Sequence, residues 1–296
     1  MPVGRELLDL WRASGARSLF VVGIGKNVGK TVTMRAVYDA AGAGDATVGL
    51  TSIGRDGEAS DAGDGAPKPR LWLRPKTVVA TARDVLPRSP ASELLDLLNL
   101  PTAAGDVLLA RVAQPAYYEL VGPPTASGVR RCVDALLSRC DLALVDGAID
   151  RVAALAGGRD AIVVAAGAAS ADSMNDAVEQ VRALVQRLGV PQFDPHEPFR
   201  RVDGALTPAL AADLIAAREP RQIVVRDPTQ IALSGKAASH ALERLRLRCE
   251  RPLHAIAATI ASIGRERTFE PKAFARAVAA ATGLPTFDVY AETRAA

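Results

Sequence analysis

One short segment near the start of the chain constrains the fold more than any other. Residues 18–23 form an apolar run that ends in glycine, and residues 30–41 have the pattern of a helix. The segment between them, GIGKNVGKT from Gly23 to Thr31, contains three glycines and two lysines. Glycines allow backbone N–H groups to approach a phosphate closely, and the N-terminus of the following helix attracts its negative charge. A strand, a glycine-rich loop and a helix in this order predict an α/β fold with a phosphate-binding loop.

Individual residues of the loop have predicted roles in nucleotide binding. Lys30 is the candidate catalytic residue, because its ammonium group would reach the β- and γ-phosphates of ATP. Thr31 is a candidate metal ligand, whose hydroxyl would bind Mg²⁺. A glycine-rich turn in which the lysines occur by chance is the alternative interpretation. The predicted nucleotide-binding residues are Gly25, Lys26, Asn27, Val28, Gly29, Lys30 and Thr31.

Acidic residues follow two further apolar runs, and both are candidates for the same site. Asp146 ends the run LALVD, so it is predicted to hold Mg²⁺ through water, as the acid of a Walker B strand does. Asp56 follows the run at 46–53 and is the candidate to orient the attacking water or bind the metal, with Glu58 as the second candidate. Parallel strands end at the same edge of a sheet, so both segments are expected to face the phosphates. The alternatives are an acid that caps the next turn for Asp146 and a solvated turn for Asp56.

Composition and charge exclude several classes of protein. Hydrophobic residues make up 49% of the 296 residues and charged residues 23%, which is typical of a globular protein and not of a disordered one. The net charge of +3 argues against a surface for nucleic acid or membrane. The three cysteines are too far apart for a disulfide scaffold or a zinc site, and the three histidines lack metal-ligand spacing. No signal peptide is visible and no apolar run approaches the length of about 20 that spans a membrane, so we expect a cytoplasmic protein.

The order of the predicted elements indicates how the chain is organised. Strands and helices alternate, which predicts a mostly parallel sheet with helices on both faces, of the kind found in P-loop NTPases. Within it, residues 90–98 are predicted to form a polar helix. A proline-rich stretch then separates a nucleotide-binding domain at 1–195 from a smaller α/β unit at 196–296, with one continuous domain as the alternative.

The spacing within the loop resembles that of one group of P-loop proteins. Five residues separate Gly23 from Gly29, where the common motif has four. This spacing is similar to the loop of dethiobiotin synthetase and its relatives, within the wider class that includes MinD-like ATPases. Those ATPases carry a signature lysine four residues before the second glycine, which is the place of Gly25 here. Lys26 stands one position later, so the trans-acting role of that lysine is not assigned to it.

Several segments together resemble a more narrowly defined family. They are GIGKNVGKTVTM at 23–34, LTSIGRDGE at 50–58, VGPPT at 121–125, LVDGAIDR at 144–151 and TFDVY at 286–290. In this order they look like the P-loop subunit of the lysine 5,6-aminomutase reactivase, often called KamB, and the resemblance spans nearly the whole chain. It implies an ATP-binding, Mg²⁺-dependent subunit that works beside a MutS-like subunit. Together they would eject damaged cobalamin from an adenosylcobalamin-dependent aminomutase, so we expect a homo- or hetero-oligomer with protein partners.

Two other functions are left open by the residues alone. One is an ATP-dependent ligase, similar to dethiobiotin synthetase, that phosphorylates a small carboxylate or carbamate bound near Lys30. The other is a nucleotide-binding regulatory subunit without turnover. Phosphoryl transfer depends mostly on positioning and charge stabilisation, so a chain that takes one of its groups from a partner would turn over slowly alone. We therefore expect an ATPase with low intrinsic turnover, and the sequence does not distinguish ATP from GTP.

Overall fold

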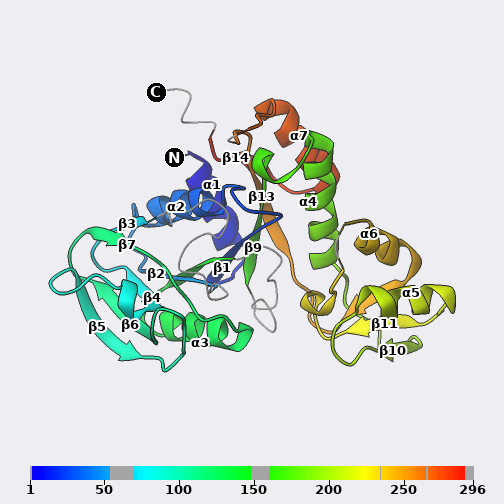
Figure 1. Cartoon of the computed structure of the whole chain (residues 1–296), viewed down its shortest axis with the longest axis horizontal. Helices are drawn as coiled ribbons and strands as arrows, with labels where there is room; N and C mark the ends of the chain where they lie inside the picture. The colour runs from blue at the N-terminus through cyan, green and yellow to red at the C-terminus, as the bar shows by residue number, and fades with distance from the viewer. Residues whose placement is uncertain (1, 54–69, 148–159, 234, 265, 291–296) are drawn as a thin grey trace. The chain divides into compact units, whose positions relative to one another are not determined.

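The chain folds into two compact units (Figure 1). The first comprises Met1–Gly23 and Gly29–Ala154, and the second comprises Ile24–Val28 and Leu155–Ala296. The boundary expected at residue 195 lies inside the second unit. Both units alternate strands with helices and most strand pairs are parallel, so the predicted α/β class is confirmed. The structure is a computed structural model, and the residues that it describes are 2–53, 70–147, 160–233, 235–264 and 266–290.

The first unit is built around six strands, of which the central ones are buried and the last, β5, is largely exposed. In spatial order they are β1 (Ser18–Gly23), β8 (Leu142–Asp146), β2 (Val48–Ser52), β4 (Val78–Ala82), β6 (Val107–Val112) and β5 (Ser92–Leu97). The pairs β1–β8, β8–β2 and β2–β4 are parallel, whereas β6 and β5 are added antiparallel. Every residue of β1, β2 and β4 is buried. Burial on both faces explains why these segments are continuous apolar runs and not alternating ones.

Helices cover both faces of these strands (Figure 1). α1 (Pro2–Ala13) packs against α2 (Lys30–Ala41) on one side, and α3 (Ala126–Leu137) lies on the other. Leu7 and Trp11 are one helical turn apart in α1 and fully buried, so α1 presents an apolar stripe to its neighbour. The other elements of this unit are the antiparallel pair β3 (Leu71–Leu73) and β7 (Ala116–Tyr118) and the 3-10 turn η1 (Arg83–Val85).

The second unit contains two sets of parallel strands. One set has β14 (Thr286–Asp288), β13 (Ala255–Ala261) and β9 (Ala161–Gly167), with the helices α4 (Met174–Leu188) and α7 (Pro271–Thr282). The other is a three-stranded sheet of β10 (Phe199–Arg201), β11 (Gln222–Val225) and β12 (Arg246–Cys249), with α5 (Pro208–Ala216) and α6 (Gly235–Arg244). Ile223, Leu247 and Leu214 belong to one apolar cluster that joins this sheet to its helices. The expected unit at 196–296 also included β13, α7 and β14, which belong to the set with β9.

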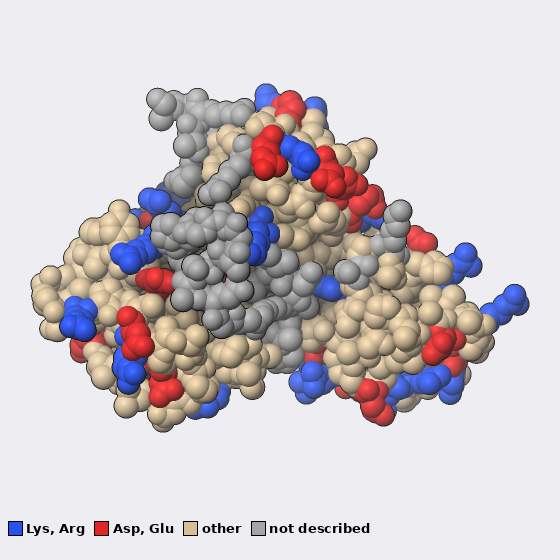
Figure 2. Space-filling model, viewed as in Figure 1, with Lys and Arg blue, Asp and Glu red and all other residues tan. Residues whose placement is uncertain are grey.

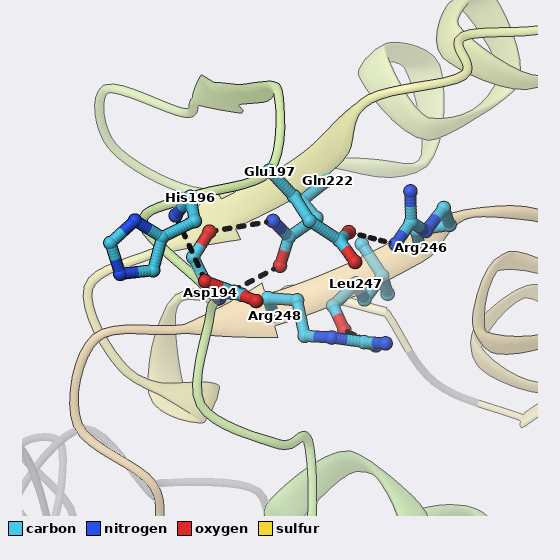
Figure 3. Close-up of polar contacts among 7 residues, drawn as sticks. All are labelled: Asp194, His196, Glu197, Gln222, Arg246, Leu247 and Arg248. Atoms are coloured by element: carbon cyan, nitrogen blue, oxygen red, sulfur yellow. Dashed lines mark hydrogen bonds and ion pairs between the residues drawn. The ribbon is translucent and has the colours of Figure 1, made fainter.

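The proline-rich stretch after α4 is held against the small sheet by hydrogen bonds (Figure 3). The Asp194 N–H donates to Gln222 Oε1 at 3.0 Å, and Gln222 Nε2 donates to the Asp194 carbonyl oxygen at 2.9 Å. The His196 N–H donates to the Asp194 carboxylate at 2.9 Å, and Glu197 forms an ion pair with Arg246. These side-chain contacts add to backbone hydrogen bonds with β12, in which the Cys249 N–H donates to the Pro191 carbonyl oxygen and the Phe193 N–H donates to the Cys249 carbonyl oxygen, each at 2.9 Å.

The expectation of a polar helix over residues 90–98 is wrong. β5 lies there and pairs antiparallel with β6. The leucines at 94 and 97 have helical spacing, which is why the segment resembles a helix when it is considered alone. The pairing changes register between Leu94 and Asp96, and a β-bulge of this kind breaks the alternation that would otherwise indicate a strand. Tertiary pairing therefore overrides the local pattern here.

Candidate functional site

The segment between β1 and α2 turns through residues in the left-handed conformation. β1 ends at Gly23 and α2 begins at Lys30, as the sequence predicts. Asn27 has φ 56°, and Gly29, the N-cap of α2, has φ 86° and ψ 11°. Glycine adopts such a φ without strain, and it brings no capping side chain to the helix end. The positive end of the helix dipole therefore meets no hydroxyl or carboxylate from its N-cap residue, which suits the binding of a phosphate.

Within the second unit, the first half of the loop packs tightly against the 3-10 turn η3 (Ala168–Ser170). A Cβ atom on Gly25 would lie 2.4 Å from Ser170 Cβ. A Cβ atom on Gly167, the last residue of β9, would lie 2.7 Å from Val28 Cα. Such distances are shorter than side chains tolerate, so the loop and the end of β9 approach each other only because both positions are glycine.

Asp146 is the last residue of β8, which lies between β1 and β2. In the parallel registers it is opposite Val21 of β1 and Ser52 of β2. The Thr31 hydroxyl donates to Asp146 Oδ2 at 3.4 Å, so the first turn of α2 meets the end of β8. Asp146 Oδ1 is buried and has no hydrogen-bond partner among the residues that the structure describes. A buried carboxylate oxygen without a donor, next to a hydroxyl, fits the oxygen ligands that Mg²⁺ prefers.

Burial changes the pKa values of Lys30 and Asp146 in opposite directions. It raises the pKa of the Asp146 carboxyl group to about 6, although the Lys30 charge and the Thr31 hydrogen bond both oppose the rise. It lowers the pKa of Lys30 below its usual range, although attraction to Asp146 opposes this fall. Both charges are therefore buried at a cost that their mutual attraction offsets only in part. Ionisable groups whose pKa values are shifted both by burial and by a charged neighbour are typical of functional sites.

The end of β2 is tied to the VGPPT turn at 121–125. Ser52 Oγ donates to the Leu120 carbonyl oxygen at 2.9 Å and accepts from the Gly122 N–H at 3.1 Å. A Cβ atom on Gly122 would lie 1.7 Å from the Ser52 carbonyl oxygen, so a side chain there is excluded. Because Ser52 is opposite Asp146, the turn is held beside the strand end that carries the acid. Sequence reasoning missed this positioning residue, since only the strand register brings it to the site.

We expect Ser52→Ala to destabilise the protein while its fold persists. The variant leaves the Gly122 N–H without its acceptor in a buried position, which lowers the free energy of unfolding by about 1–3 kcal/mol. Chemical denaturation followed by circular dichroism measures this loss. Ser127→Ala is the matched control, because Ser127 is exposed in α3 and its replacement should change little. Equal stability of the two variants would contradict the positioning role.

Of the predicted site residues, the structure brings Lys30, Thr31 and Asp146 together. Asp56 and Glu58 fall at 54–69, outside the described residues, so their roles stay predictions. In the described ranges, no group of three or more His, Cys, Asp or Glu side chains is placed to hold a metal ion. This does not conflict with a magnesium site, because Mg²⁺ is commonly held by one or two carboxylates together with substrate phosphates and water.

No protein-family model matches the chain, and neither a curated protein nor a solved structure matches it. Among the helices of the described ranges, none has both the length and the apolar composition needed to cross a bilayer.

Proposed function

We propose that this chain binds Mg·ATP through the segment from Gly25 to Thr31 and hydrolyses it slowly. One observation carries the proposal: the Thr31 hydroxyl at the start of α2 meets the buried Asp146 carboxylate at the end of β8, and Lys30 interacts electrostatically with the same carboxylate. A hydroxyl, a carboxylate and an ammonium group at the N-terminus of a helix are the groups that a metal–triphosphate complex needs.

Each residue would act through a defined contact. Lys30 would donate hydrogen bonds to oxygens of the β- and γ-phosphates, and the backbone N–H groups of the loop would surround the phosphates. Thr31 and Asp146 would hold Mg²⁺, the former through its hydroxyl and the latter directly or through water. When bound, Mg²⁺ neutralises charge on the phosphates. Asp56 keeps its proposed role of orienting the attacking water.

The biological role that we propose rests on the resemblance of the sequence segments. On that basis the chain is the ATP-binding subunit of a factor that reactivates an adenosylcobalamin-dependent amino acid aminomutase, beside a MutS-like subunit. Figure 2 shows basic and acidic side chains interspersed over the described surface of one face, which supports a protein partner better than nucleic acid. The cysteines Cys132, Cys140 and Cys249 are free and buried, which supports a reducing compartment such as the cytoplasm.

Calorimetric titration of ATP, followed by an assay of phosphate release, tests this proposal. We expect ATP to bind in the presence of Mg²⁺ and at least about tenfold more weakly in EDTA, because Thr31 and Asp146 would hold a metal ion that neutralises charge on the phosphates. GTP titrated in the same way determines the base preference. Phosphate release should be slow for the isolated chain and faster when the partner subunits are added. No binding of either nucleotide would overturn the proposal, and binding without any release, partners included, would favour a regulatory subunit.

A further inference from the structure

The outer edge of the sheet in the first unit exposes much apolar surface. β5 is the last strand in the order of this sheet, so no other strand among the described residues pairs with its outer edge. Leu94 and Leu97 of β5 are 56% and 57% exposed. Sheet edges are usually protected by charges, bulges or a covering segment, because an open apolar edge pairs readily with another strand.

The bulge in β5 brings both exposed leucines to the same face. In the pairing with β6, Leu94 is opposite Ala110 and Leu97 is opposite Leu108. Ala110 and Leu108 are alternate residues of β6, so they share a face, and Leu94 and Leu97 therefore share that face too. A cavity of about 440 Å³, lined by Leu86, Leu94 and Leu108 among others, continues this apolar surface.

The backbone of β5 also offers an outward-facing donor. The Leu98 N–H donates to the Val107 carbonyl oxygen at 3.0 Å, toward β6. Successive residues of a strand direct their N–H groups to opposite sides, so the Leu97 N–H points away from β6. It donates to the carboxylate of Asp96, its neighbour in sequence, at 2.8 Å. The Asp96 carboxylate is exposed, so a backbone carbonyl of an incoming strand can replace it as the acceptor of the Leu97 N–H.

We propose that β5 pairs with β5 of a second copy of this chain, antiparallel and about a twofold axis. In the register that we infer, Leu94 of each copy lies opposite Leu97 of the other. Both exposed leucines then gain an apolar cross-strand partner, and the pairing is repeated by symmetry. The faces match in this register, because Leu94 and Leu97 lie on the same face of their own strand.

The charged residues of β5, Glu93 and Asp96, are both acidic, so a second copy can pair only in a register that keeps them from directly opposed positions. Glu93 already forms an ion pair with Arg111 of β6 at 2.8 Å. In the dimer, Glu93 would lie opposite Leu98 of the other copy, and Asp96 would lie opposite its Leu95. No carboxylate lies directly opposite another, so the leucine pairs form without the repulsion that like charges cause in directly opposed positions.

Sedimentation velocity over a range of protein concentrations tests the association. We expect the chain to be dimeric at about 100 µM, a concentration at which a modest interface is populated. Leu94→Asp and Leu97→Asp should each weaken the dimer at least about tenfold, because the pairing would bury a carboxylate against leucine. Tyr117→Ser is the control, since Tyr117 is 60% exposed on β7 and lies outside β5. A monomeric wild type, or a dimer that Leu94→Asp leaves intact, overturns the proposal.

Single-cysteine variants test the register. A mixture of L94C and L97C should form disulfide-linked dimers on oxidation, because directly opposite residues have Cα atoms within reach of a disulfide. Either variant alone should not, since its two cysteines would be about three residues, or roughly 10 Å, apart along the strands. The native cysteines Cys132, Cys140 and Cys249 are buried, which limits other crosslinks. Crosslinking of one variant alone, with no gain in the mixture, would overturn the register.

Discussion

Replacement of Lys30 by alanine should weaken Mg·ATP binding by roughly 100-fold. The lysine would otherwise make charge-assisted hydrogen bonds to phosphate oxygens, and such bonds contribute about 1.5–3 kcal/mol each. A loss of about 3 kcal/mol corresponds to a factor of roughly 100 in the dissociation constant. Lys30 is partly buried, which lowers its pKa, and water therefore screens the attraction between its ammonium group and a phosphate less than it would at the surface. Calorimetric titration of wild type and variant measures the difference.

Lys76→Ala is the matched control for this experiment. Lys76 is an exposed lysine of the same unit, so its removal changes the net charge equally and should leave binding unchanged. Circular dichroism and a thermal transition close to that of the wild type would establish that Lys30→Ala is folded. Undiminished binding by a folded Lys30→Ala variant would refute the phosphate-binding loop. A similar loss in both variants would mean that net charge, and not the position of Lys30, governs binding.

The strand, loop and helix around Lys30 were predictable because their determinants lie within one short segment. The apolar run at 18–23 is buried at every position in β1, and the helix begins at the residue where the spacing places it. Gly29 adopts a backbone conformation, with φ 86°, that other residues rarely adopt. Local features of this kind depend on neighbouring residues only, so a sequence pattern can identify them.

The contact between Thr31 and Asp146 depends on the order of strands, which no local pattern specifies. The two residues are 115 positions apart, and they meet because β8 is inserted between β1 and β2. The apolar run before Asp146 predicts a strand that ends in an acid, and the sheet-edge rule predicts its side of the sheet. The rule does not predict which strands are neighbours. Ser52 was missed for this reason, since its role beside Asp146 exists only in the β2–β8 register.

The sequence pattern does not predict helix α5, and it predicts a helix where strand β5 lies. In both segments packing against the rest of the fold determines the conformation. α5 contains Ala209, Leu210 and Ala211 in succession, so it lacks a clear apolar stripe. Its start is marked by Thr207, whose hydroxyl caps the helix by accepting a hydrogen bond from the Leu210 N–H at 3.3 Å. β5 has leucines at helical spacing, but β6 presents it with a partner strand. In both segments the local preference is weak, and the tertiary contacts determine the conformation.

Burial of the Asp146 carboxylate destabilises the folded protein at neutral pH. Its pKa is about 6 in the folded protein, compared with an ordinary value of 3.8. Between these values the folded state binds more protons than the unfolded state, so stability falls as the pH rises through this window. Above pH 6 the folded protein has lost all of this stability, which for a pKa difference of this size is about 3 kcal/mol. Such a loss is common where a side chain is retained for a ligand and not for the fold.

Asp146→Asn should therefore stabilise the protein without ligand and remove its response to Mg·ATP. Asparagine keeps the shape and the acceptor for the Thr31 hydroxyl but has no charge to bury, so at pH 8 the variant should gain about 2–3 kcal/mol, or several degrees in Tm. The gain should shrink as the pH is lowered from 8 to 5, because the wild-type carboxyl group is then protonated. Thermal unfolding at both pH values, with and without Mg·ATP, measures both effects. A variant less stable than wild type at pH 8 would mean that the attraction of the Asp146 carboxylate to Lys30 outweighs the cost of burying it. The carboxylate would then stabilise the fold, and its burial would no longer be an argument for a metal ligand.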